Sequence, residues 1–403
     1  MPFILGFFYG PKMDDNNIQK EFELAGRSSY LRIDLDTILH NINTLREFCS
    51  KTTDVIAVIK ANAYGHGSLE IARYLEANGI SHFAVATAWE GAQLRQYGVT
   101  GYIQILGSCI KEDIHTTCKF NLTPTTCTTE FLQAWSDWHL NQNKITGSIV
   151  IKFDTGMGRN GCQLTELNSL IQKCDDLKIP VHSVMTHFSQ AWDDSIFTQQ
   201  QLDTFLTATK DLRCRGIKVH AANSAAIIQG YGRDLDFVRP GICMYGLPPD
   251  PSEATVEKIK SLNLKPALSW LAKPTLVKLL PPGSYVGYDK TYQCKEEEII
   301  GTFSIGYADG YRRLLSSAGG YLTSIDGKRF PIVGRVSMDA ITVKLDSLDS
   351  QKVYYVMKND YTSGHSLTKL AAELKTIPYE IATSLSQRLP RLYVSDEKLT
   401  VTI

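Results

Sequence analysis

Eight short apolar runs recur between residues 55 and 242 of this 403-residue chain, and they constrain its fold more than any other feature. Most of them have the length and the β-branched composition of parallel strands that are buried on both faces. The runs are Val55–Ile59, His82–Thr87, Tyr102–Gly107, Asn121–Thr126, Ser148–Asp154, Val181–His187, Lys218–Asn223 and Asp236–Ile242.

Segments with helical spacing separate most of these runs. In Ser68–Asn78, for example, Ile71 and Leu75 share one face, and Phe197–Leu212 shows the same spacing. Eight alternating β/α units predict a closed (β/α)8 barrel of the TIM type, which we place at residues 36–265.

The pattern changes after the proline-rich stretch Pro248–Pro251. Beyond about residue 265, strand-like alternation and turn pairs such as Asp326-Gly327 dominate, with one helical patch at Leu367–Leu374. We therefore expect a mostly β C-terminal domain at residues 266–403, so that the fold class is α/β plus β. Residues 1–27 are expected to be a poorly ordered N-terminal extension.

Composition narrows the class of protein. Lys plus Arg and Asp plus Glu number 42 each, so the balance gives no electrostatic case for nucleic acid or an anionic membrane surface. The nine cysteines contain no CxxC pair, which favours reduced thiols and no metal site. The apolar stretch Phe3–Tyr9 is too short to span a membrane and lacks a basic flank. We expect a soluble cytoplasmic protein.

A lysine stands where the first apolar run ends. Lys60 follows Val55–Ile59 directly, and a charged ammonium at the end of a buried strand is costly to desolvate. Two interpretations are open at this point. The side chain reaches solvent along its aliphatic stem, or its amine has condensed with a carbonyl group.

Other chemically active residues follow the later runs. Lys152 and Arg159 come with the fifth run, His187 with the sixth, and Arg239 and Gly241 with the eighth. Each has an ordinary structural explanation when taken alone; His187 could be a packing histidine and Gly241 a plain turn. In a barrel, however, all carboxyl ends meet at one face, so the pattern predicts a site there.

The sequence resembles the bacterial-type alanine racemases in seven motifs, which occur in that family's order from about residue 29 to the C-terminus. The motifs are KANAYGHG, KFDTGMGRNG, HAANSAA, RPGICMYG, VGYDKTY, GYADGYRR and GRVSMDA. The resemblance implies racemisation of alanine with pyridoxal 5′-phosphate, and a place in D-alanine biosynthesis. It also implies a strand at residues 28–35 that joins the C-terminal domain, and a homodimer with active sites shared across the interface.

The resemblance assigns the two bases. Lys60 would hold the cofactor as a Schiff base, which removes the buried charge, and would then serve one face of the substrate Cα. Tyr288 of the partner subunit would serve the other face. A tyrosine with an ordinary pKa of about 10 is a poor base at neutral pH and needs local help. The resemblance implies that this help comes from a chain of interacting side chains, which runs from Arg239 through His187 to Tyr288. In this chain the arginine keeps the histidine neutral.

The remaining site residues follow from the same resemblance. Cofactor contacts fall on Tyr64, His187, Asn223, Ser224, Arg239, Gly241, Ile242 and Gln387. Substrate contacts fall on Arg159, which holds the carboxylate, and on Met338, Asp339 and Tyr307 at the entrance. Lys152 matches a lysine that is carbamylated in many members, where the carbamate can orient Arg159. Arg239 would face the pyridine nitrogen and make the ring a weaker electron sink, which favours racemisation over decarboxylation.

One position departs from the family pattern. Gln387 stands where most members carry a tyrosine that narrows the entrance, so serine could be accepted better than in a typical member, unless water or a neighbouring side chain fills the gap. A serine or broad small-amino-acid racemase is therefore an open alternative. A decarboxylase of the same architecture is disfavoured by Arg239 and by the lack of a glycine triplet. A non-catalytic cofactor-binding protein is disfavoured by the second domain.

Overall fold

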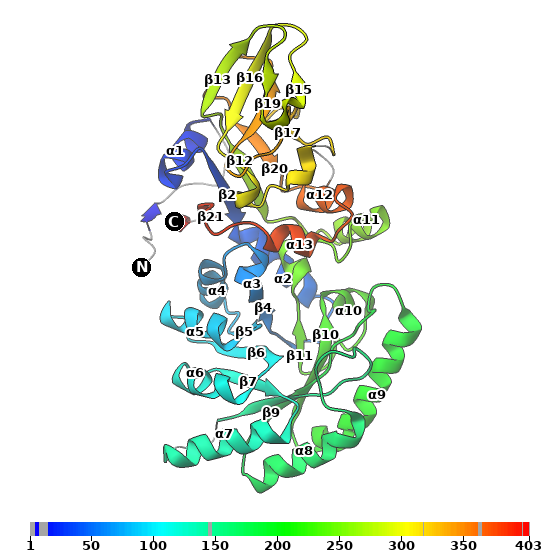
Figure 1. Ribbon diagram of the computed structural model, residues 1–403. Helices are drawn as coiled ribbons and strands as arrows, with labels where there is room; N and C mark the ends of the chain where they lie inside the picture. The colour runs from blue at the N-terminus through cyan, green and yellow to red at the C-terminus, as the bar shows by residue number, and fades with distance from the viewer. Residues whose placement is uncertain are drawn as a thin grey trace. The chain divides into compact units, whose positions relative to one another are not determined.

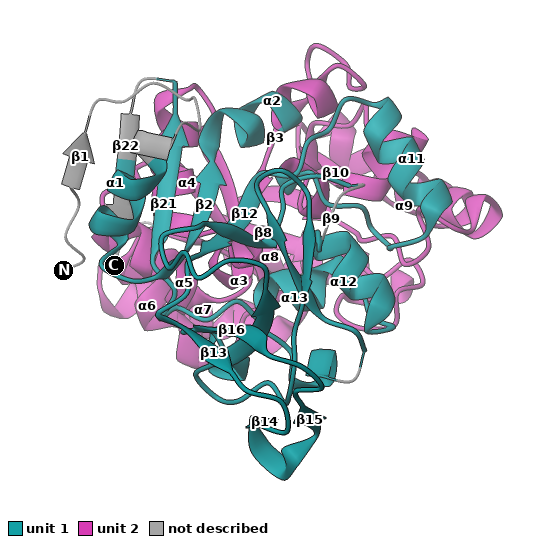
Figure 2. Cartoon of the chain, turned by 90° about the horizontal axis from the view of Figure 1, so that it is seen from above, with its two compact units in different colours: residues 1–41, 245–403 teal, residues 42–244 magenta. Residues whose placement is uncertain are grey.

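The computed structural model describes residues 5–7, 15–143, 147–316, 318–361, 365–396 and 398–402. The chain divides into two compact units, which Figure 2 colours separately. The barrel unit comprises residues 42–244, and the second unit comprises residues 1–41 with 245–403. Each unit is described below by itself.

The barrel unit is built on a parallel sheet that closes on itself. Its strands are β3 (Asp54–Val55), β4 (Ala57–Val58), β5 (His82–Val85), β6 (Tyr102–Ser108), β7 (Thr123–Thr126), β8 (Ile149–Lys152), β9 (Val181–Met185), β10 (Lys218–Asn223) and β11 (Phe237–Arg239). The sheet order runs from β3 through β11 and down to β5 and β4.

Closure occurs within the segment that contains β3 and β4. The two strands are separated by Ile56 alone, whose amide donates to Val238 of β11 at 2.8 Å. The amide of Ile59 donates to Ala84 of β5 at 2.9 Å. One continuous segment thus pairs with the last strand on one side and with the second on the other, and the predicted TIM-type barrel is confirmed.

Helices cover the outside of this barrel (Figure 1). They are α4 (Ser68–Ala77), α5 (Ala88–Gln96), α6 (Ile114–Lys119), α7 (Thr129–Asn141), α8 (Leu164–Asp176), α9 (Ser195–Cys214) and α10 (Ser224–Gln229). Both helices singled out from the sequence are present, as α4 and α9. Ile71 and Leu75 of α4 are buried, as an amphipathic helix on a barrel requires.

The second unit is mostly β structure. Its largest sheet has the order β1-β22-β21-β2-β12-β20-β17-β18, beside a three-stranded sheet β13-β16-β19 and a hairpin β14-β15. The strands are β1 (Leu5–Phe7), β2 (Ser29–Asp34), β12 (Leu268–Ala272), β13 (Leu276–Leu280), β14 (Tyr285–Val286), β15 (Tyr292–Gln293), β16 (Glu298–Phe303), β17 (Tyr321–Ser324), β18 (Arg329–Pro331), β19 (Ile341–Leu345), β20 (Tyr354–Met357), β21 (Arg391–Ser395) and β22 (Lys398–Thr402). β2 pairs antiparallel with β12 and parallel with β21, so residues 29–34 lie in this sheet.

The helices of this unit are α1 (Asp15–Ala25), α2 (Leu35–Arg46), which runs past the unit boundary, α11 (Glu253–Ser261), α12 (Leu367–Glu373) and α13 (Pro378–Thr383). α12 coincides with the helical patch expected from the sequence. Residues 245–265, which the sequence grouped with the barrel, cluster with the second unit. The side chain of Asn41 helps to hold this segment in the second unit, because it exchanges two 2.8 Å hydrogen bonds with the backbone of Lys265.

The N-terminal segment differs from its expectation. Residues 15–25 form helix α1 rather than part of a poorly ordered extension. Ile18 and Phe22 are buried in a core cluster with Tyr30, Leu271 and Leu392, which gives the helix an apolar platform. Residues 1–4 and 8–14 lie outside the described residues.

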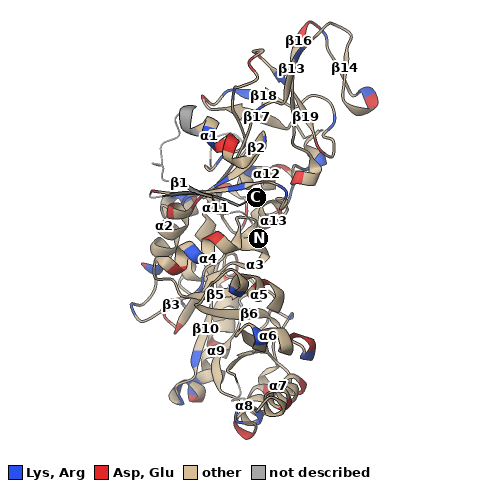
Figure 3. Ribbon diagram, turned by 90° about the vertical axis from the view of Figure 1, so that its left-hand side faces the viewer, with Lys and Arg blue, Asp and Glu red and all other residues tan. Residues whose placement is uncertain are grey.

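Charge and hydropathy are distributed without strong bias. Figure 3 shows basic and acidic residues interspersed along both units. None of the described helices has the length and apolar character needed to cross a bilayer.

Candidate active site

Lys60 stands at the carboxyl end of the first barrel strand, where the backbone makes a left-handed turn. It begins α3 (Lys60–Tyr64), and the φ angles of residues 61–64 lie between 51° and 53°. Non-glycine residues cost roughly 1–2 kcal/mol each in this conformation, so the turn needs support. Glu90 provides it: Oε1 accepts the amide of Ala61 and Oε2 the amide of Ala86, each at 2.7 Å. Glu90 therefore ties the residue after Lys60 to the end of β5.

Four cations of the barrel unit influence one another at these strand ends. Burial lowers the pKa of Lys60 below its ordinary 10.5, and the charges of Arg159 and Arg239 lower it further, against an opposing effect of Glu90. Lys152 is buried at the end of β8, where burial and then Arg239 and Arg159 lower its pKa to about 8. A group of positive charges suits an anionic ligand, and an amine with a lowered pKa suits attack on a carbonyl carbon.

Arg159 lies on a turn that Asp154 organises. Oδ1 of Asp154 accepts the amides of residues 156 and 157 at 2.9 and 2.8 Å, and Oδ2 accepts that of residue 158 at 2.9 Å. Gly161 closes the turn with a φ of 132°, and a Cβ atom there would lie 2.6 Å from the backbone nitrogen of Asp154. This packing fixes the position from which Arg159 extends.

Arg239 is buried and makes short hydrogen bonds to neutral acceptors. Its Nη1 lies 2.6 Å from Nδ1 of His220, and its Nη2 donates to the carbonyls of Thr186 and Ala221 at 2.8 Å each. Burial lowers the pKa of Arg239 to about 9, which still leaves it charged at neutral pH. Among the hydrogen bonds of the described residues, none joins its guanidinium to a carboxylate.

The partner of Arg239 differs from the expected one. Within the described residues, its guanidinium hydrogen-bonds His220 and not His187, because His220 lies on β10, directly beside β11. The charge of Arg239 still affects His187, because burial and then this charge hold the pKa of His187 well below 6.5. Burial and then the charge of Arg239 also hold the pKa of His220 well below 6.5, so both histidines are neutral, as the predicted arginine effect on His187 requires.

A cradle of small polar groups lies at the ends of the seventh and eighth strands. Ser224 begins α10, and its Oγ accepts the amide of Gly241 at 2.8 Å. A Cβ atom on Gly241 would lie 2.7 Å from the hydroxyl of Tyr64, so only glycine lets the two approach. Asn223 caps α10 by accepting the amide of Ala226 at 3.0 Å, and Ile242 opens the next 3₁₀ turn.

The cradle offers donors without adding charge. Burial raises the pKa of Tyr64, which keeps its hydroxyl protonated. Hydroxyls and backbone amides that approach closely are suited to a phosphate group.

Tyr288 belongs to the second unit and projects from the turn between β14 and β15. Its side chain is 69% exposed. Asp289 has a φ of 61° and pairs with Nε of Arg335 at 2.5 Å, which holds the turn against its neighbouring loop. Val286 and Val333 anchor the base of the hairpin in a small buried cluster.

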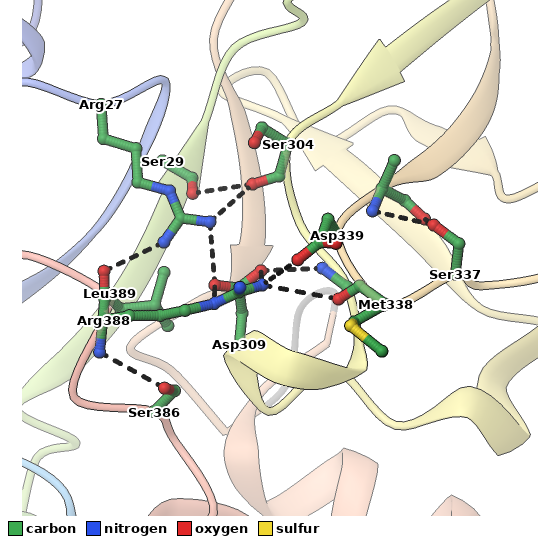
Figure 4. Close-up of polar contacts among 12 residues, drawn as sticks. Arg27, Ser29, Ser304, Asp309, Ser337, Met338, Asp339, Ser386, Arg388 and Leu389 are labelled. Carbon is green, nitrogen blue, oxygen red and sulfur yellow. Dashed lines mark hydrogen bonds and ion pairs between the residues drawn. The ribbon is translucent and has the colours of Figure 1, made fainter.

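The other predicted residues of the second unit lie on three adjoining loops. Figure 4 shows Met338 and Asp339 of one loop beside Asp309 and Arg388 of the other two. The amide of Tyr307 donates to Ser337 at 3.0 Å, which joins the first loop to the Met338–Asp339 loop. Asp339 pairs with Nη2 of Arg388 at 2.8 Å, and Gln387 is the exposed residue that precedes Arg388. The structure thus brings Tyr307, Met338, Asp339 and Gln387 together.

Sequence reasoning missed five residues that shape these sites. Glu90, Asp154, His220, Asp309 and Arg388 all hold functional segments in place through hydrogen bonds. A signal existed for Asp154, His220 and Asp309, since each is a charged or titratable residue inside a recognised motif and its role was left unassigned. Glu90 and Arg388 carried no such mark.

Comparisons with known proteins agree across both units. Residues 33–249 match the family model for the alanine racemase N-terminal domain, and residues 267–393 match that for the C-terminal domain. The chain is 35% identical to an alanine racemase of Halothermothrix orenii and 36% identical to one of Carboxydothermus hydrogenoformans. The first match covers 91% of this chain and 97% of the relative, the second 91% and 100%.

Solved structures give the same result. The alanine racemase of Bacillus anthracis with bound L-Ala-P has a TM-score of 0.84 at 33% identity, covering 93% of this chain and 98% of the other. The alanine racemase of Bartonella henselae, described with covalently bound pyridoxal phosphate, has a TM-score of 0.77 at 29% identity, covering 91% and 99%.

Proposed function

Since the chain belongs to the alanine racemase family, we propose that it interconverts L-alanine and D-alanine with pyridoxal 5′-phosphate. The observation that carries the proposal is the cationic end of the barrel, where Lys60 lies within the electrostatic influence of Arg159 and Arg239. Such a site accommodates an anionic cofactor and the carboxylate of an amino acid together.

The residues of the barrel unit fit this cofactor. The cradle of Tyr64, Ser224 and the amides at residues 241 and 242 suits its phosphate, with Asn223 and His187 as further contacts. Arg239, whose hydrogen bonds fix it to neutral groups, suits the pyridine nitrogen. The bound cofactor supplies the electron sink that makes the substrate α-proton acidic.

Lys60 would link the cofactor and then exchange a proton with Cα on one face. Its lowered pKa supports both tasks, because the neutral amine is the form that attacks a carbonyl and accepts a proton. Tyr288 of the partner subunit would exchange a proton on the opposite face. Its exposure on a hairpin turn supports a role outside its own chain, and hence a homodimer.

Arg239 would favour racemisation over other reactions. A guanidinium does not lend its proton to the pyridine nitrogen, so less electron density moves into the ring and more remains at Cα for reprotonation. The hydrogen bond to His220 and the two to carbonyls restrain the guanidinium, which supports this role. This argues against decarboxylation or transamination as the main reaction.

Lys152 would carry a carbamate. Its pKa of about 8 leaves a fraction of the amine neutral at neutral pH, which is the form that reacts. The amine nitrogen adds to the carbon of CO2 and one proton is released. The resulting anion would balance Arg159 and Arg239 and orient Arg159 toward the substrate carboxylate.

Serine is the second candidate substrate. Gln387 is shorter than the usual tyrosine and keeps a donor and an acceptor, so room and a polar partner exist for a hydroxymethyl group. We also assign the enzyme to the cytoplasm, which its nine free cysteines support.

Chiral product analysis tests the proposal. The purified protein, supplied with pyridoxal 5′-phosphate, is incubated separately with L-alanine, D-alanine and L-serine. Formation of the opposite alanine enantiomer from either side, faster than serine racemisation, is the expected result. Release of CO2 or of pyruvate as the main product, or no reaction, would overturn it.

A further inference from the structure

Asp309 is a fully buried carboxylate of the second unit that accepts four hydrogen bonds. Its Oδ1 accepts from Nη2 of Arg27 and from Nε of Arg388, both at 2.8 Å. Its Oδ2 accepts from Nη2 of Arg388 at 3.0 Å and from the amide of Gly306 at 2.9 Å. Figure 4 shows both arginines converging on it. A buried charge is tolerated only with such complete pairing, so the arrangement is well defined.

The same group joins the three loops that carry the predicted entrance residues. The backbone carbonyl of Asp309 accepts the amide of Ser386 at 3.1 Å, next to Gln387. Arg388 reaches across to Asp339 at 2.8 Å. At Gly306 a Cβ atom would lie 2.1 Å from the carbonyl of Met338, so the first two loops are in direct backbone contact.

Arg27 connects a distant part of the chain to these loops through hydrogen bonds. It lies between α1 and β2, outside the residues that match the family models. Besides Asp309, it donates to the carbonyl of Ser304 at 3.0 Å and to that of Arg388 at 3.1 Å. Its side chain is 21% exposed, so these contacts are partly shielded from water.

We propose that Arg27, Asp309 and Arg388 form an entrance brace, a set of positioning residues that fixes Tyr307, Met338, Asp339 and Gln387 at the substrate entrance. With Asp339 the brace contains two cations and two anions, so it holds the loops without adding net charge. The inference rests on the proposed function, because these four residues are taken to line the path of the amino acid.

Loss of Arg27 should loosen the entrance without removing the brace. Asp309 would keep Arg388 as its partner, whereas the carbonyls of Ser304 and Arg388 would lose a shared donor. The entrance residues meet the substrate on its way to the reacting atoms and do not touch its α-proton. The change should therefore raise KM more than it lowers kcat.

The test compares Arg27→Met with Arg32→Met as a matched control. Arg32 lies five positions along the same segment, and its Nε donates to Glu21 of α1 at 3.3 Å rather than to a residue of the entrance loops. Steady-state kinetics with L-alanine should show KM about fivefold higher for Arg27→Met and nearly unchanged for Arg32→Met. Arg27→Lys keeps the charge but not the forked donor, so its KM should lie between wild type and Arg27→Met.

A second readout does not depend on turnover. Hydrogen–deuterium exchange reports the amides of Tyr307 and Ala308, which donate to Ser337 and Met338 at 3.0 and 3.1 Å. These amides should exchange faster in Arg27→Met than in Arg32→Met. Equal exchange in the two variants, or an unchanged KM in an active, folded Arg27→Met, would refute the brace. A wild type that fails to racemise alanine would refute the proposed function instead, and the exchange comparison would still decide the brace.

Discussion

Nη1 of Arg239 lies 2.6 Å from Nδ1 of His220, and this contact fixes the protonation state of the histidine. A guanidinium only donates, so Nδ1 must accept and the ring proton sits on Nε2, which faces Oγ of Ser183 at 3.1 Å. Burial and then the charge of Arg239 hold the pKa of His220 well below 6.5. The arginine is thus oriented by a neutral partner and keeps its full charge.

Removing this partner should impair catalysis through Arg239. His220→Leu leaves a buried donor without its acceptor, at a cost of about 1–3 kcal/mol, whereas His220→Asn can offer an oxygen near the position of Nδ1. We expect kcat/KM for alanine to fall about tenfold or more in the leucine variant and less in the asparagine variant. Equal losses would mean that the contact only supports packing.

Lys60 should be indispensable for cofactor linkage. Lys60→Arg preserves the positive charge at the strand end but cannot form the covalent link. The variant therefore distinguishes the effect of the charge from the effect of the covalent link. Turnover should fall at least about a hundredfold, and the visible absorption band of the linked cofactor should be lost. A band that persists, and that borohydride fixes to another lysine, would show the assignment to be wrong.

Lys152 should make stability depend on pH in the alkaline range. Its pKa is about 8 in the folded protein against an ordinary 10.5, so between these values the unfolded chain binds more protons. The free energy of unfolding therefore rises with pH across this window, and the charged lysine costs about 3 kcal/mol below it.

Lys152→Met isolates this contribution. Denaturation in CO2-depleted buffer at about pH 7 and about pH 10 should show wild type gaining stability relative to the variant as pH rises. A difference that stays constant with pH would contradict the lowered pKa of Lys152.

Gln387 should widen the substrate range. A hydroxyl contact made only in the transition state would contribute about 1 kcal/mol, or several-fold in rate. Gln387→Tyr should therefore lower kcat/KM for serine while preserving that for alanine. An unchanged serine-to-alanine ratio would mean that water or a neighbouring side chain already fills the space.

The fold could be predicted to the extent that its signals are local. Buried parallel strands need continuous apolar runs, so all eight runs fall on strands of the barrel. Helix α1 was missed because its apolar face is meaningful only against Leu271 and Leu392, which are far away in the sequence. Residues 245–265 cluster with the second unit through contacts that are equally distant, since Asn41 binds Lys265 across 224 positions.

The residues of the site divide in the same way into those with a local sequence signal and those defined by distant contacts. Residues at strand ends, such as Lys60 and Arg239, could be proposed from the chain because a barrel brings those ends to one face. The contacts of Asp309 could not be predicted, even though the residue lies inside a motif, because its partners Arg27 and Arg388 are 282 and 79 positions away. Only the folded chain shows that these charges meet.

The measurement that tests the two-base account most directly is exchange of the α-proton with solvent in each alanine enantiomer. Tyr288→Phe removes the hydroxyl and keeps the ring, and Tyr285→Phe, on the same hairpin and also exposed, is the matched control. With Tyr288→Phe, racemisation should collapse and cofactor binding should persist, with D-alanine still exchanging its proton through Lys60 and L-alanine not. Equal residual exchange from both enantiomers would contradict a separate base on each face.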